Sequence, residues 1–160
     1  MKIKPILFNS ISTKHTSYSV DFELDSNITF IQGDSGVGKS AVFSFLQEMA
    51  VEDKRIRCIN YLDVKKSYKT TIKNSRGKCF VIDNADILLD DSLRSYISMD
   101  GNNQYIIIGR NPTGLLLSTD EIYELVNSFT EGITTFSLKK ALFSLLMHNQ
   151  WYYQILLTCL

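Results

Sequence analysis

The segment Gly33–Ser40 constrains this chain more than any other part of it. It reads Gly-Asp-Ser-Gly-Val-Gly-Lys-Ser and matches the phosphate-binding pattern G-x-x-x-x-G-K-[ST] in full. An apolar run at 28–31 precedes it, and residues with helical spacing follow at 41–50. The pattern requires this context, because a buried strand must lead into a tight turn and then into a helix whose first amides point at an anion. The sequence therefore predicts a nucleoside triphosphate site.

Each part of this loop has a chemical role in the predicted site. Its glycines adopt backbone conformations that a side chain would hinder, so successive N–H groups can converge on phosphate oxygens. Lys39 would reach the β- and γ-phosphates, and the Ser40 hydroxyl would bind Mg²⁺. The alternative is a glycine-rich turn that binds nothing, which the complete match disfavours. The predicted nucleotide-binding residues are Gly33, Asp34, Ser35, Gly36, Val37, Gly38, Lys39, Ser40 and Ala41.

With this loop the chain resembles the P-loop NTPase superfamily, and a second motif of that superfamily is matched by Cys79–Asp83. This run is apolar and ends in a carboxylate. The resemblance implies that Asp83 stands at the end of a strand beside the loop and binds a Mg²⁺-coordinated water, while Ser40 binds the metal directly. The structural alternative is that Asp83 or Asp86 caps the following helix, and Asp86 suits that role better.

The residues after Asp83 bear on hydrolysis. In the branch of the superfamily with an additional strand between the two motifs, a Glu often follows this Asp and orients the attacking water; here Asn84 takes that place. An Asn can position water but cannot take up a proton, and Asp86 is the nearest carboxylate that could. The resemblance therefore implies slow ATP hydrolysis or a switch-like ATP cycle. No Asn-Lys-x-Asp guanine-reading sequence occurs, so adenine is the default base.

A further apolar run, Tyr105–Ile108, predicts a strand that is buried on both faces of a parallel sheet. In AAA-type and STAND-type ATPases the strand after the second motif ends in a polar residue near the γ-phosphate. Arg110 or Asn111 follows the corresponding strand of this chain and would sense whether the γ-phosphate is present. A plain turn with a solvated Arg110 explains the same residues equally simply.

The order of these elements predicts an α/β fold of the P-loop NTPase type, a three-layer sandwich with a mostly parallel sheet. An N-terminal antiparallel strand pair is expected at 3–8 and 18–24, where the second strand alternates apolar and polar residues. Between the two nucleotide motifs we expect a strand at 56–62 and then a helix opened by Asp63, which supplies the additional strand of the AAA/STAND-like branch.

Past Pro112 the sequence leaves two local structures open. Ser118 and Glu121 have the spacing of a capping box, which predicts a helix start. The segments 122–126 and 133–138 also fit a pair of strands around a turn. Both alternatives are compatible with the residues.

Length and composition bound the domain organisation. The chain has 160 residues with 44% hydrophobic content, enough for one core. We expect a nucleotide-binding domain at 1–138 and an apolar element at 139–160 that packs on it or binds a partner. Polar residues interrupt the last segment, so a membrane span is not expected. The first residues lack an apolar signal core, which favours a cytoplasmic protein, and the apolar end is also compatible with a fragment of a longer one.

The charge distribution contains one local bias. Lys+Arg and Asp+Glu both total 17, so a uniformly basic nucleic-acid surface is excluded. The segment Lys65–Lys78 nevertheless carries only basic charges, which would suit contacts to a nucleic-acid backbone. The solvated face of an amphipathic helix is the favoured reading. Cys58, Cys79 and Cys159 lie too far apart for a metal or redox motif.

Three functions are compatible with these motifs. The first is an ATPase or ATP-dependent switch that acts on an unidentified macromolecular partner. The second is a small-molecule kinase, which normally needs an arginine-rich lid; the chain has five arginines and no cluster among them. The third is a nucleotide-binding regulatory protein without turnover.

Overall fold

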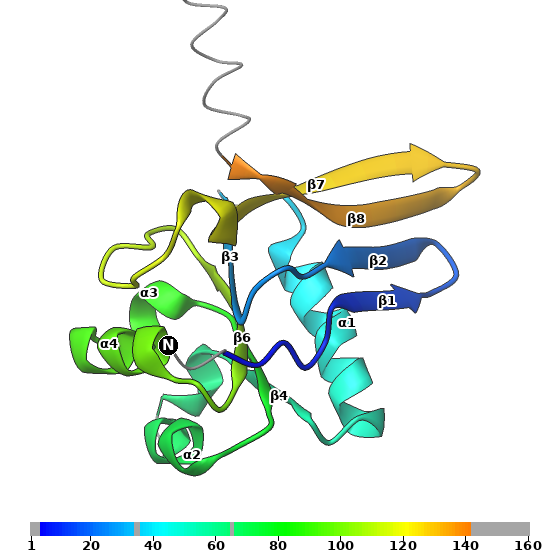
Figure 1. Ribbon diagram of the computed structural model, residues 1–160. Coiled ribbons are helices and arrows are strands. Elements are labelled where there is room, and N and C mark those ends of the chain that lie inside the picture. Colours follow the sequence, from blue (N-terminus) through cyan, green and yellow to red (C-terminus); the bar gives the residue numbers. More distant parts are fainter. Residues whose placement is uncertain (1–3, 34–35, 65, 142–160) are drawn as a thin grey trace, which may run out of the picture.

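The computed structural model describes residues 4–33, 36–64 and 66–141 (Figure 1). Its strands form one mixed sheet in the order β1-β2-β8-β7-β3-β6-β5-β4. The strands are β1 (Ser10–Lys14), β2 (Tyr18–Glu23), β3 (Ile28–Gln32), β4 (Ile56–Ile59), β5 (Cys79–Ile82), β6 (Gln104–Gly109), β7 (Ile122–Thr130) and β8 (Ile133–Lys140). The helices are α1 (Lys39–Glu52), α2 (Tyr68–Asn74), α3 (Ala85–Leu88) and α4 (Asp91–Met99), with short 3₁₀ turns η1 (Tyr61–Asp63) and η2 (Thr119–Glu121). Most of the predicted apolar element at 139–160 lies outside these residues.

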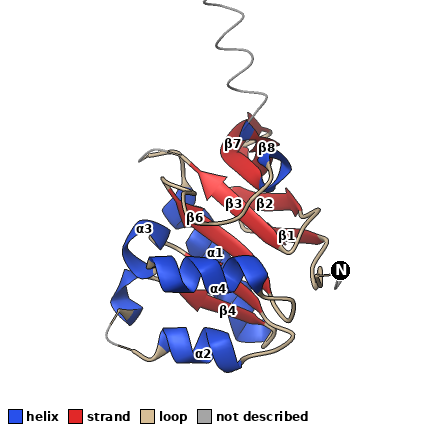
Figure 2. Cartoon of the chain, turned by 60° about the vertical axis from the view of Figure 1, so that its left-hand side comes forward, coloured by secondary structure: helices blue, strands red, loops and turns tan. Residues whose placement is uncertain are grey.

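The central strands β3, β5 and β6 are almost completely buried and run parallel to one another. Their continuous apolar sequences suit this position, because helices cover both faces of this part of the sheet. Helix α1 packs on one face, and α2, α3 and α4 pack on the other. Figure 2 shows α4 in front of these strands and α1 behind them.

The outer strands are buried on one face only. In β2, Val20 and Phe22 are fully buried while Asp21 and Glu23 are exposed, and β1 and the start of β7 also alternate between more and less buried positions. Their buried side chains join the same core as α1. In Figure 1 these strands lie around α1, so the sheet curls over this helix as a half-barrel.

The predicted three-layer sandwich with a mostly parallel sheet and an N-terminal antiparallel strand pair is therefore wrong. The N-terminal pair belongs to the same sheet as β3, because β2 pairs in parallel with β8, and the β7–β8 hairpin joins it to β3. The result is an eight-stranded mixed sheet. Strand twist accumulates across so many strands, and curling brings the one-sided outer strands onto α1.

Three predicted element boundaries are also wrong. The strand expected at 56–62 ends at Ile59, because the 3₁₀ turn η1 follows it. The first strand begins at Ser10 rather than within 3–8, because the amides of Leu7 and Phe8 donate to the side-chain Oε1 of Gln104, both at 2.9 Å. A side chain therefore satisfies this backbone in place of a neighbouring strand. Asp63 ends η1, where it accepts from the Asn60 amide at 3.0 Å in a capping box. Helix α2 accordingly begins only at residue 68.

Both alternatives for the segment after Pro112 occur together. The capping box of Ser118 and Glu121 is present in η2, and the strand pair follows directly as β7 and β8. Glu131 and Gly132 join the two strands with φ of 51° and 81°. Two successive positive φ values suit a tight hairpin turn whose twist matches that of its strands.

Candidate functional site

The predicted phosphate loop connects β3 to α1, as its flanking sequences indicate. Gly36 and Gly38 have φ of 92° and 99°, a region that favours glycine. Gly38 is the N-cap residue of α1, no side chain caps it, and the first turn contains no acidic residue. The positive end of a 14-residue helix therefore faces the loop without a carboxylate nearby in its own first turn. The predicted binding residues Asp34 and Ser35 lie outside the described residues.

A tertiary contact adds a second reason for glycine at position 38. A Cβ there would lie 2.4 Å from Cε1 of Phe136, a buried side chain of β8. The C-terminal hairpin thus packs directly against the loop. This contact joins residues about a hundred positions apart, so no local pattern could predict it.

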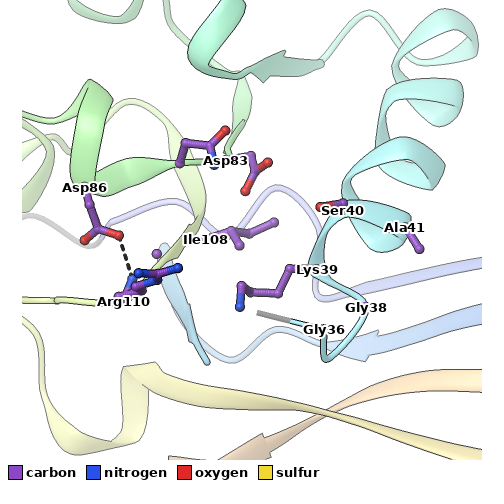
Figure 3. A pocket seen from close by; sticks show the side chains of 11 residues that line it. Gly36, Gly38, Lys39, Ser40, Ala41, Asp83, Asp86, Ile108 and Arg110 are labelled. Atoms are coloured by element: carbon purple, nitrogen blue, oxygen red, sulfur yellow. Dashed lines mark hydrogen bonds between the residues drawn. The ribbon is translucent and has the colours of Figure 1, made fainter. Parts of the chain in front are cut away.

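A pocket of about 390 Å³ opens at the start of α1 and gathers residues from three elements (Figure 3). Lys39 and Ser40 come from α1, Asp83 follows β5, and Arg110 follows β6. In Figure 3, Ser40 projects toward the side of the pocket that carries Asp83. The residues that line the pocket are Gly36, Gly38, Lys39, Ser40, Ala41, Asp83, Asn84, Asp86, Ile108, Gly109 and Arg110.

Two predicted binding residues lie outside this pocket. Gly33 and Val37 line a neighbouring cavity of about 290 Å³, together with Gln32, Glu124 and Leu125. Arg110 lines both cavities and separates them. The Lys39 ammonium donates to the backbone carbonyl of Gly33, so the lysine side chain folds back over its own loop.

Asn84, rather than Asp83 or Asp86, is the N-cap residue of α3, so the capping alternative for those carboxylates is wrong. Its backbone has φ 56° and ψ 43°, the left-handed region in which Asn is one of the few favoured side chains. Its side chain makes no capping bond, and its Oδ1 atom is buried without a hydrogen-bond partner among the described residues. A buried acceptor without a partner beside a pocket calls for a water or a ligand.

Asp86 anchors the end of β6. Its two carboxylate oxygens accept from the backbone N–H groups of Arg110 and Asn111, at 2.9 and 3.1 Å. The sequence suggested Asp86 as a general base; the structure gives this carboxylate a positioning role in the loop that carries Arg110.

The same loop is held from its other side by Arg94 of α4. This buried guanidinium donates to the carbonyls of Leu89, Asn111 and Thr113, at 2.9 to 3.0 Å. Side chains from two helices therefore hydrogen-bond the backbone of 110–113, the segment that carries Arg110 at the pocket.

The end of β6 lines the pocket with Ile108 and Gly109, which were not identified as site residues from the sequence. A Cβ on Gly109 would lie 3.1 Å from Cβ of Ala85 and 3.3 Å from Cζ of Phe30. The glycine lets β6 approach α3 closely and brings Arg110 and Asp86 together. A glycine at the end of a β-branched run is the one sequence signal of this contact.

The donor set of the pocket suits Mg²⁺ only together with phosphate ligands. Within the described ranges, no group of three or more His, Cys, Asp or Glu side chains could hold a metal by itself. A hydroxyl and one carboxylate do fit Mg²⁺ where phosphates and waters complete its shell, because this ion retains waters and is usually bound by few protein ligands. Ser40 and Asp83 supply such a pair.

Other charged and sulfur-containing residues lie away from this pocket or serve the core. In the basic segment, Lys66 pairs with Asp63 and Lys69 with Asp90, each at 2.6 Å, so these charges are partly neutralised within the chain. Burial raises the pKa of the Cys79 thiol to about 12, which keeps it protonated and makes it a small apolar core residue.

The comparisons with protein-family models, with curated proteins and with solved structures gave no match. Along the described parts of the chain, none of the helices has the length and hydropathy needed to cross a bilayer. The function is therefore inferred from the pocket itself.

Proposed function

We propose that the chain binds Mg²⁺-ATP in the pocket at the start of α1 and works as a slow ATPase or ATP-dependent switch. The observation that carries this proposal is the convergence of Lys39, Ser40, Asp83 and Arg110 on one pocket beside the uncapped end of α1. Lysine and arginine would bind the β- and γ-phosphates, while serine and aspartate would hold the metal. When bound, Mg²⁺ would neutralise phosphate charge.

Slow turnover is supported by the residues around the expected position of the attacking water. Asn84 offers a buried carbonyl oxygen that can accept from a water but cannot remove its proton. The nearby carboxylate of Asp86 is occupied by two backbone amides. A positioned general base typically contributes roughly a hundred- to ten-thousand-fold, and its absence would leave ATP bound for long periods.

A switch also needs a path from the nucleotide to a partner. Arg110 would contact the γ-phosphate, and its loop is tied to α3 by Asp86 and to α4 by Arg94. These helices carry exposed apolar side chains, Ile87 at 68% and Met99 at 75% exposure. A movement of Arg110 would thus be transmitted to the exposed apolar side chains of α3 and α4 through the hydrogen bonds of Asp86 and Arg94.

The kinase alternative has less support. Arg110 is the one arginine that lines the described pocket, and Arg94 is committed to backbone carbonyls of its own chain. Neither Arg110 nor Arg94 therefore forms a lid that would exclude water from a transferred phosphoryl group.

The direct test is calorimetric titration of the purified chain with Mg²⁺-ATP, using wild type, Lys39→Ala and Lys54→Ala. Losing a charge-assisted bond to phosphate costs roughly 1.5–3 kcal/mol, so Lys39→Ala should weaken binding by about tenfold or more. The exposed Lys54 lies outside the pocket, and its variant should bind as wild type does. Equal affinities for all three folded proteins would overturn the proposal.

A further inference from the structure

Four aromatic rings form a series of contacts that begins beside the phosphate loop, and we call them the aromatic row: Phe136, Tyr18, Phe45 and His15. Phe136 packs against Gly38, and the Tyr18 ring lies 6.2 Å from it at an angle of only 9°. Phe45 is 6.2 Å from Tyr18, and His15 stacks on Phe45 at 4.7 Å. The row therefore extends from the loop to the turn between β1 and β2.

The row begins at Gly38, within the loop whose amides would bind the phosphates. The backbone amides of such loops cradle the α- and β-phosphates, while the lysine reaches the β- and γ-phosphates. With the γ-phosphate near Lys39 and Arg110, the α-phosphate lies toward Ala41, the last residue of α1 in the pocket lining. In Figure 3, Ala41 projects from the side of α1 opposite to Asp83.

Helical geometry continues this path to the row. Phe45 follows Ala41 by four residues, so the two side chains share one face of α1 and are about 6 Å apart along the helix axis. Both pack against the same core as Phe136. The nucleoside would thus extend across Ala41 toward rings that stand within one helical turn.

We infer that the aromatic row is the nucleoside-binding part of the site and that Tyr18 stacks on the base. This inference rests on the proposed binding of ATP. Tyr18 is the suitable residue because it is 46% exposed, whereas Phe136, whose ring lies nearly parallel to that of Tyr18, is buried. Every nucleobase has a π-face, so stacking binds a base without reading its hydrogen-bonding edge.

The inference predicts that the row distinguishes a nucleotide from an inorganic phosphate chain. Mg²⁺-ATP and Mg²⁺-tripolyphosphate share the phosphate contacts, but only ATP carries a base. Stacking of a base on an aromatic ring is worth about 5- to 150-fold in affinity. We expect Tyr18→Ala to weaken ATP by about that factor and to leave tripolyphosphate unchanged.

The experiment titrates both ligands into wild type, Tyr18→Ala, Tyr18→Phe and Tyr61→Ala, with thermal unfolding as a check of folding. Tyr18→Phe keeps the ring and should bind ATP within about twofold of wild type. Tyr61 is a similarly exposed tyrosine in η1, which follows β4 at the edge of the sheet away from β2, so its loss should change neither ligand. In Tyr18→Trp, ATP but not tripolyphosphate should change the indole fluorescence relative to wild type.

The outcomes separate the two proposals. Unchanged ATP affinity in Tyr18→Ala, or an equal loss for both ligands, overturns the stacking role while phosphate binding stands. If a Tyr18→Trp protein binds ATP without a change in its fluorescence, the stacking role is overturned as well. This outcome is informative even where Tyr18→Ala fails to fold. Absence of binding by either ligand to wild type overturns the proposed function itself.

Discussion

At the scale of single residues, Asn84 serves two requirements at once. Its φ of 56° is one that Asn tolerates and most other side chains avoid, at a cost of about 1–2 kcal/mol. Its buried Oδ1 lies beside the pocket without a partner among the described residues. The position at which the proposed ATPase lacks a Glu is thus also one where the backbone conformation disfavours Glu.

This double role yields a prediction for two variants. Asn84→Glu should raise single-turnover ATP hydrolysis, by a measurable part of the roughly hundred-fold or more that a general base contributes. It should also lower the midpoint of thermal unfolding by a few degrees, because about 1 kcal/mol corresponds to roughly 2–4 °C for a chain of this size. Asn84→Gly relieves the strain and should leave stability near that of wild type without faster hydrolysis. If Asn84→Glu binds ATP as tightly as wild type but hydrolyses it no faster, the attacking water does not lie beside residue 84.

At the scale of elements, the loop between β6 and η2 (Thr119–Glu121) behaves as a clamped segment. Asp86 binds its amides, Arg94 binds its carbonyls, and Gly109 allows β6 to approach α3. Such a loop would report γ-phosphate occupancy by moving helices with it rather than by rearranging alone.

Asp86→Ala tests this clamp against a catalytic role. Loss of two amide contacts at an exposed carboxylate should cost about 1–2 kcal/mol, lowering the unfolding midpoint by about 2–8 °C. ATP affinity should fall with it, because Arg110 is no longer held at the pocket. Asp86→Asn retains one acceptor oxygen and should show a smaller loss of stability.

Calorimetry and single-turnover hydrolysis on the same samples distinguish the two roles. A general base would show the reverse pattern, namely unchanged stability and ATP affinity with hydrolysis reduced by roughly a hundred-fold or more in both variants.

At the scale of the whole molecule, the core is divided by the sheet, and Cys79 lies fully buried at the start of β5 in the part next to α1. Burial raises the pKa of this thiol to about 12, against about 8.5 for an exposed thiol. Between these values the unfolded chain has released the proton that the folded chain keeps. The unfolded state then binds fewer protons, so stability decreases as pH rises.

The prediction is a loss of unfolding free energy above pH 8.5, reaching about 2 kcal/mol from this thiol by pH 10. Cys79→Val removes the titrating group at similar volume and should flatten the decline by that amount. Urea titrations at pH 7, 8.5 and 10 measure it for both proteins. Parallel declines would show that Cys79 does not govern the alkaline limit.

Interactions between residues that are close in sequence determined which features could be predicted from the sequence alone. The loop motif, the β-branched runs of the central strands and the helical spacing after Ser40 each depend on neighbours within a few residues. They located Lys39, Ser40 and Asp83, which meet in one pocket. Such patterns can be recognised in a sequence because backbone geometry and helix or strand periodicity involve only residues within a few positions of one another.

The tertiary structure alone decided how the outer strands are used. The pairing of β2 with β8, with Ser19 hydrogen-bonded to Thr135 at 2.7 Å, joins residues 116 positions apart. It replaced the expected sandwich by a curled sheet, brought Phe136 to Gly38 of the loop and placed Tyr18 against Phe136. Alternating strands specify which face is buried but not which strand lies beside them, because partner choice depends on burying the whole apolar surface at once.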